Sequence, residues 1–235
     1  MKTRVVLQRL DNYERHATKA AIAELLAPLG GISAFVRPGQ RVLLKPNMLA
    51  GKGVEAAVTT HPEIVRAVIE LVQSAGGIVS VGDSPGVGTP QQVAQRCGIL
   101  AVIEETGATF APFSESIRIT PRSGTFHHFE IARDIVEAEV IINLPKLKTH
   151  QMMGMTCAVK NLFGAVIGLR KAHGHLQAGA DDSGRGAGDG GGWPRQWRPD
   201  PAWCPSRRGG TDGGRCCGCG TDRSGAGDDL DLVRG

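Results

Sequence analysis

Lysine, asparagine and histidine side chains are concentrated in the stretch INLPKLKTHQMMGMTCAVKNLFG, residues 142–164. This stretch follows the apolar run Val140–Ile142, which is typical of a buried strand. Ammonium groups neutralise anions, and side-chain amides orient them through hydrogen bonds. We therefore interpret the stretch as part of a site for a small anionic or phosphorylated ligand. Its candidate residues are Asn143, Lys146, Lys148, His150, Lys160 and Asn161.

Two other stretches also place polar residues directly after an apolar run. LLKPN, residues 43–47, carries Lys45 and Asn47, and VGDSPG, residues 81–86, carries Asp83 and Ser84. In open α/β sheets the ligand crevice lies outside the carboxyl ends of the strands. We therefore expect these polar groups to edge a ligand crevice, provided that their strands are neighbours in the sheet.

The expected roles follow from the chemistry of each residue type. Asp83, His150 and Lys160 are the catalytic candidates, because they can accept or release a proton. The remaining candidates bind the ligand by charge or hydrogen bonding, and they are Lys45, Asn47, His61, Ser84, Asn143, Lys146, Lys148 and Asn161.

Structural explanations compete with these roles. Lys45 could equally be a solvated strand-end residue, and His61 before Pro62 is more often a helix cap than a ligand. Asp83 is a natural turn residue, and GDSPGVG lacks the spacing of a phosphate loop. Lys160 lies in an apolar segment, where an unpaired ammonium is costly, so there we favour a function.

The elements around these residues alternate between strand and helix. We predict strands at 4–10, 41–45, 78–81 and 140–144, with further extended segments at 108–110, 117–120 and 126–131. We predict helices at 18–29, 62–74 and 91–97, and another short helix that ends at 106. We also predict a helical turn at 132–138 and helical spacing over 152–166. This alternation predicts an α/β fold, a mostly parallel sheet with helices on both faces.

Five blocks together resemble the "domain of unknown function 362" family. They are VLLKPNML, TTHPEIVRAVIELV, VGDSPG, INLPKLKTHQMMGMTCAVKNLFG and GLRKAH, and the resemblance covers about residues 1–176. It implies an α/β fold and, since many members carry or adjoin four-iron ferredoxin modules, a redox association with an iron–sulfur protein partner of the ferredoxin type. No general reaction follows from the resemblance, and the cofactor is unknown.

The composition changes after residue 176. The 59 residues from Gln177 to Gly235 include 16 Gly, 8 Arg and 9 Asp, with no Lys or Glu. Such a segment cannot bury enough apolar surface to offset its ordering entropy. We therefore expect a domain at 1–176, incomplete at its C-terminus, and a tail at 177–235. The tail is interpreted either as an out-of-frame segment or as a disordered one.

The totals exclude several classes of protein. The net charge of +4 is mild and forms no basic run, which argues against a nucleic-acid partner. No apolar run approaches the roughly 18 residues of a membrane helix, and no secretion signal is present, so we expect a cytoplasmic protein without a membrane partner. The cysteine spacing fits neither an iron–sulfur ligand set nor a zinc site, so no metal is assigned.

These observations leave three functional alternatives. The first is a redox-associated protein that binds a small anion at the strand ends, with enzymatic activity undecided. The second is a non-enzymatic module that binds an anion or a nucleotide. The third is an inactive, truncated product. Two or more carboxylates or histidines at the ligand favour catalysis, whereas lysines and asparagines alone favour binding.

Overall fold

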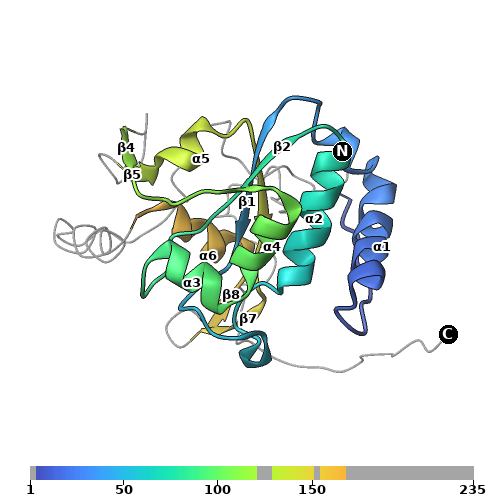
Figure 1. The fold of residues 1–235 in the computed structure, drawn as a ribbon, viewed down its shortest axis with the longest axis horizontal. Coiled ribbons are helices and arrows are strands. Elements are labelled where there is room, and N and C mark those ends of the chain that lie inside the picture. Colours follow the sequence, from blue (N-terminus) through green and yellow to red (C-terminus); the bar gives the residue numbers. More distant parts are fainter. Residues whose placement is uncertain (1–3, 121–128, 151–153, 168–235) are drawn as a thin grey trace, which may run out of the picture.

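The computed structural model describes residues 4–120, 129–150 and 154–167, and its centre is a four-stranded parallel sheet (Figure 1). The strand order is β3-β2-β1-β6. The strands are β1 (Arg41–Pro46), β2 (Ile78–Val81), β3 (Thr109–Phe110) and β6 (Val140–Leu144). Strand β1 is buried from Val42 onward, as expected for an inner parallel strand covered on both faces.

Helices cover one face of this sheet. They are α2 (Pro62–Ser74), α3 (Pro90–Arg96) and α4 (Ile99–Thr106), while α1 (Arg15–Leu26) packs on the outside of α2 (Figure 1). The 3₁₀ turns η1 (Ala27–Leu29), η2 (Ile32–Ala34) and η3 (Val54–Ala56) lie in the connections. The main hydrophobic core joins this face to the helices, and it includes Val42, Leu44, Val65, Ile69, Val81, Ile99 and Ile103.

The opposite face is covered by a smaller layer. It contains helix α5 (Arg133–Glu137), the antiparallel pair β4 (Ser116–Ile119) and β5 (Phe129–Ala132), and the 3₁₀ turn η4 (Phe163–Ala165). A second core cluster lies here, built from Leu43, Ala111, Phe113, Ile131, Ile135 and Ala165. Alternate residues of β1 therefore face opposite cores, which confirms the predicted α/β fold with both faces covered.

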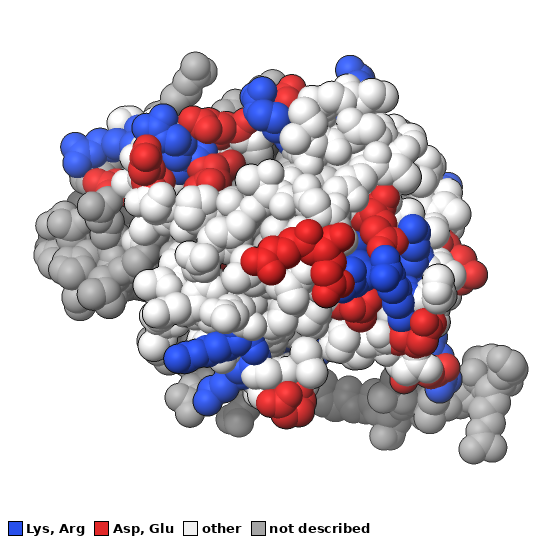
Figure 2. Space-filling view, in the orientation of Figure 1, with Lys and Arg blue, Asp and Glu red and all other residues white. Residues whose placement is uncertain are grey.

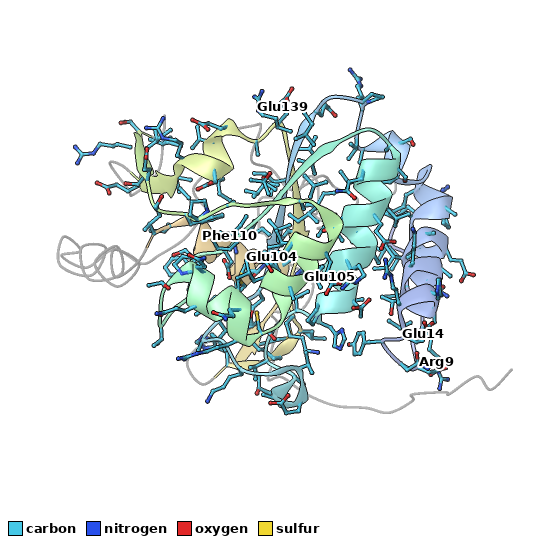
Figure 3. The ribbon with its side chains drawn as sticks, in the orientation of Figure 1. Arg9, Glu14, Glu104, Glu105, Phe110 and Glu139 are labelled. Atoms are coloured by element: carbon cyan, nitrogen blue, oxygen red, sulfur yellow. The ribbon has the colours of Figure 1, made fainter. Side chains whose placement is uncertain are left out.

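The chain reverses its lateral direction at β1. From β1 it proceeds through α2 to β2 and then to β3 on one side, whereas β6 pairs with β1 on the other side. A hairpin, β7 (Lys148–His150) with β8 (Gly154–Thr156), and helix α6 (Ala158–Leu162) follow β6. Glu139, directly before β6, lies at the end of the sheet where the parallel strands begin (Figure 3). The β7–β8 hairpin lies toward the opposite end, where these strands finish (Figure 1). The carboxyl ends of β1 and β6 thus lie at a topological switch point of the sheet.

Most predicted elements are confirmed, and two are wrong. The strands at 78–81 and 140–144 and the helix at 62–74 have the predicted bounds. Arg4–Leu10 is not a strand: it has no regular secondary structure, and Leu7 is 91% exposed. The predicted helical segment 152–166 contains strand β8 and only a short helix, because Gly154 has φ +71° and the chain after it pairs with β7. Residues 126–128 and 151–153 lie outside the described residues.

Candidate functional site

A buried ion pair joins the carboxyl ends of β1 and β2. Lys45 Nζ lies 2.5 Å from Asp83 Oδ1, and the two side chains are 0% and 5% exposed. The second carboxylate oxygen of Asp83 accepts the backbone N–H of Met48 at 3.0 Å. Lys45 therefore is not a solvated strand-end residue, and both oxygens of Asp83 are engaged. A buried charge of this kind is tolerated only because its partner is fixed in place.

An amide network lies beside the ion pair. Asn161 Nδ2 donates to the carbonyl of Lys45 at 3.1 Å and to Asn143 Oδ1 at 2.7 Å. Its Oδ1 accepts from Asn47 Nδ2 at 3.1 Å, and Asn143 Nδ2 donates to the carbonyl of Ala158 at 2.9 Å. Since Lys45 and Asn143 are register partners, Asn161 ties α6 across the switch point between β1 and β6.

Lys148 reaches this network from strand β7. Its Nζ donates to Asn47 Oδ1 at 2.8 Å and to the carbonyl of Val58 at 2.5 Å. Burial lowers the pKa of Lys148, Asp83 opposes this effect, and the ammonium groups of Lys146 and Lys160 lower the pKa further. Lys146 and Lys160 thus both act on Lys148 at the carboxyl end of the sheet.

The two neighbouring lysines, Lys146 and Lys160, are as buried as Lys148. Lys146 and Lys160 are half-buried, and Lys160 Nζ lies 5.0 Å from the centre of the Phe163 ring, in cation–π geometry. Among the described residues, no carboxylate lies within 4.0 Å of Lys146, Lys148 or Lys160. The only acidic side chain that acts on the pKa of Lys148 is Asp83, which is already paired with Lys45.

The other predicted site residues lie at the margin of this group. Ser84 is buried directly after Asp83. His150 is half-buried at the end of β7, opposite Gly154. Lys146 contributes to a lowered pKa of His61, although burial is the larger cause and Glu63 opposes both.

His61 has the structural role that competed with ligand binding. It caps helix α2, because its Nδ1 accepts the backbone N–H of Glu63 at 3.2 Å. Its ring also stacks on Tyr13, with centroids 3.8 Å apart and an angle of 8° between the planes. These contacts use one ring nitrogen and one ring face, and a ligand role for His61 stays a prediction.

Three further residues support the site and were missed from the sequence. Thr60 Oγ1 accepts the N–H of Asn47 at 2.8 Å and donates to the carbonyl of Leu144 at 2.6 Å, so it braces the ends of β1 and β6. Gly164 lies so close to the ion pair that a Cβ there would stand 2.2 Å from Asp83 Oδ1 and 2.6 Å from Lys45 Nζ. Met48 contributes only its backbone. The sequence shows Gly164 only as the last residue of the block CAVKNLFG, and that position does not indicate its contact with the ion pair.

The group combines three half-buried lysines with a buried network of hydrogen bonds. Among the residues described, no three His, Cys, Asp or Glu side chains are grouped so that they could hold a metal ion. Within the same residues, no helix has the length and apolarity to span a membrane. The excess of ammonium groups over carboxylates means that a bound anion would lower the electrostatic repulsion among them.

Comparison with known proteins gives a family and one relative. The chain is 44% identical over 177 residues to "Thylakoid-associated protein sll1697" of Synechocystis sp. (strain ATCC 27184 / PCC 6803 / Kazusa). This alignment covers 75% of the chain but 55% of the relative, so the chain spans about half of that protein's length. No solved structure matches. The family described as Domain of unknown function (DUF362) matches residues 42–199, past the expected boundary at 176, and the chain belongs to this family.

Proposed function

We propose that the chain binds a small anionic or phosphorylated ligand at the carboxyl ends of β1 and β6. The observation that carries the proposal is the charge imbalance at Lys146, Lys148 and Lys160. Lys146 and Lys160 both lower the pKa of Lys148, and no carboxylate of the described residues lies within 4.0 Å of the three ammonium groups. Like charges are held together in a partly desolvated site only at a cost, and an anionic ligand removes that cost.

The buried network supports such a site by fixing its base. Lys45, Asp83 and Asn161 are at most 4% exposed, and each is hydrogen-bonded across two elements. A binding site whose supporting side chains are locked by packing and hydrogen bonds holds its ligand-contacting groups in a narrow range of positions. We assign ligand contact to the lysines and structural support to the asparagines and the ion pair.

The described contacts favour binding over catalysis. Asp83 is the one carboxylate within the hydrogen-bonded network, and both of its oxygens are engaged, so it is poorly placed to accept a proton. His150 and Lys160 remain the candidates for proton transfer if the bound anion also reacts. An inactive product is the alternative, and it predicts that no anion binds.

The proposal also includes a redox association and a cellular location. An iron–sulfur partner is suggested by the family resemblance alone, and binding to a reduced [4Fe–4S] ferredoxin, measured by calorimetry, tests it. We propose a cytoplasmic location. The relative's name associates that protein with thylakoids, so a membrane surface in the cytoplasm is the alternative, and fractionation of cells distinguishes the two.

Calorimetry with inorganic phosphate and pyrophosphate tests the anion site. We expect Lys146→Ala and Lys160→Ala each to weaken binding by roughly 10- to 100-fold, since a charge-assisted hydrogen bond contributes about 1.5–3 kcal/mol. Lys19→Ala is the matched control, because Lys19 lies on α1 and pairs with Glu70 at the surface. Equal losses in Lys19→Ala and Lys146→Ala indicate a non-specific charge effect and contradict the proposal. Wild-type protein that binds neither anion also contradicts it.

A further inference from the structure

The hydroxyl of Thr156 is buried without a hydrogen bond. Thr156 is 3% exposed, and its Oγ1 has no partner among the described residues. Leaving a buried hydroxyl unsatisfied costs free energy, and the large majority of buried side-chain polar atoms in proteins are paired. Thr156 is also close in the chain to the lysine group, at the end of β8 and four residues before Lys160.

The hairpin register turns Thr156 toward the anion site. Thr156 pairs with Lys148 in the antiparallel β7–β8 ladder. Directly opposed residues of such a ladder project their side chains from the same face, with Cβ atoms roughly 4.5–5.5 Å apart. The Lys148 side chain extends from that face to Asn47 and the carbonyl of Val58. The hydroxyl of Thr156 therefore lies on the cluster side of the hairpin.

The charge at this position limits the class of ligand. Lys146, Lys148 and Lys160 supply three positive charges, and Asp83, the acidic group that acts on Lys148, is paired with Lys45. A monocarboxylate brings one negative charge, whereas a phosphate monoester brings about two above pH 6 and offers three acceptor oxygens. A dianion matches both the surplus charge and the additional donor that Thr156 provides.

We propose that the ligand is a dianionic oxyanion of the phosphate-monoester class, and that one of its oxygens accepts the hydroxyl hydrogen of Thr156. This inference rests on the proposed anion site and names its ligand class. Since Thr156 Oγ1 is buried, the side chains that cover it must move when the ligand binds. Thr156 is then a specificity residue, and the lysines supply most of the affinity.

Two substitutions at Thr156 test this role. Thr156→Val keeps the shape and removes the hydroxyl, and Thr156→Ser keeps the hydroxyl. In the free protein Thr156→Val should melt at or above the wild-type temperature, because it removes an unsatisfied polar atom. Calorimetry should show about ten-fold weaker binding of inorganic phosphate to Thr156→Val, the effect of losing one hydrogen bond worth about 1.4 kcal/mol. Thr156→Ser should bind phosphate as the wild type does.

The outcomes separate this inference from the proposed function. Wild-type phosphate affinity in Thr156→Val, with weakened binding in Lys146→Ala, overturns the role of Thr156 and leaves the anion site standing. Acetate that binds the wild type as tightly as phosphate overturns the dianion class. If Thr156→Val does not fold, loss of phosphate binding in a folded Thr156→Ser overturns the inference instead. No binding of any anion to the wild type ends both proposals.

Discussion

Two lysine–carboxylate ion pairs of this protein have the same chemistry and similar distances but differ in their exposure to solvent. Lys19 on α1 pairs with Glu70 on α2 at 2.7 Å, with 45% and 17% of the side chains exposed, and Arg15 shares the same carboxylate. Lys45 and Asp83 are 0% and 5% exposed. The outer helices show positive and negative side chains intermixed at the surface (Figure 2). Charge is therefore balanced and solvated at α1 and α2, but desolvated and in positive excess at the strand ends.

The comparison teaches that position, and not residue type, decides what an ion pair contributes. A surface pair gains little because water and salt screen it, and because two long side chains lose entropy. A buried pair contributes specificity at a high desolvation cost, and removing one partner leaves an uncompensated charge. The ion pair at Lys45 therefore fixes one arrangement of β1 and β2 at the edge where the ligand is proposed to bind.

The largest expected effect comes from breaking the buried pair. Lys45→Met leaves Asp83 buried without its cation, and we expect the free energy of unfolding to fall by about 3–5 kcal/mol. Urea unfolding followed by circular dichroism measures the loss. Lys19→Met makes the same chemical change at the surface and should cost about 1 kcal/mol or less. Similar losses in the two variants are incompatible with the comparison.

A smaller effect is expected where the backbone closes over the pair. In Gly164→Ala the new Cβ would stand 2.2 Å from Asp83 Oδ1, so either η4 or the ion pair must shift. Overpacking of this kind costs typically about 1–3 kcal/mol, and we expect a loss of that size in urea unfolding. Gly86→Ala is the control, since its Cβ would have one ordinary contact at 3.8 Å on an exposed loop. A neutral Gly164→Ala would show that the close packing is not required.

The sequence could predict the sheet but only part of the site. Strands β1, β2 and β6 are short runs rich in large aliphatic residues, so their positions could be predicted from the sequence to within one residue. That Lys45, Asn47, Asp83, Asn143, Lys148 and Asn161 converge required the strand order, which places β6 beside β1. Strand order depends on long-range pairing, which no local pattern encodes.

The failures have physical causes of the same kind. Arg4–Leu10 has the composition of a strand, yet a strand exists only where a partner strand accepts its hydrogen bonds, and none of the described strands pairs with it. Residues 152–166 have apolar spacing that fits a helix, but Gly154–Thr156 within them pairs with Lys148–His150 instead. Thr60 and Gly164 could not be selected, because their roles depend on residues distant in the chain.

The smallest expected effect concerns the charge of Lys148. It is a difference between Lys148 in the site and Lys19 at the surface in how each contributes to the pH dependence of the free energy of unfolding. Burial lowers the pKa of Lys148, so its folded-state pKa lies below the value of about 10.4 in the unfolded chain. Between these two values the unfolded state binds more protons, and the contribution of Lys148 to the free energy of unfolding therefore rises with pH. Lys148→Met should remove this rise, while Lys19→Met should not.

Deprotonation of Lys148 should also affect ligand binding. It raises the free energy of unfolding as the pH rises, but it should lower the affinity for phosphate. A phosphate ester keeps its two charges above about pH 6, so from pH 7 upward the protein alone changes its charge. As Lys148 loses its proton, the site loses one of the cations that attract the ligand, and phosphate affinity should fall with rising pH. Calorimetry of wild type and Lys148→Met between pH 7 and pH 10 measures both slopes. A phosphate affinity in the wild type that does not change over this range would mean that Lys148 belongs to the buried support and not to the ligand site.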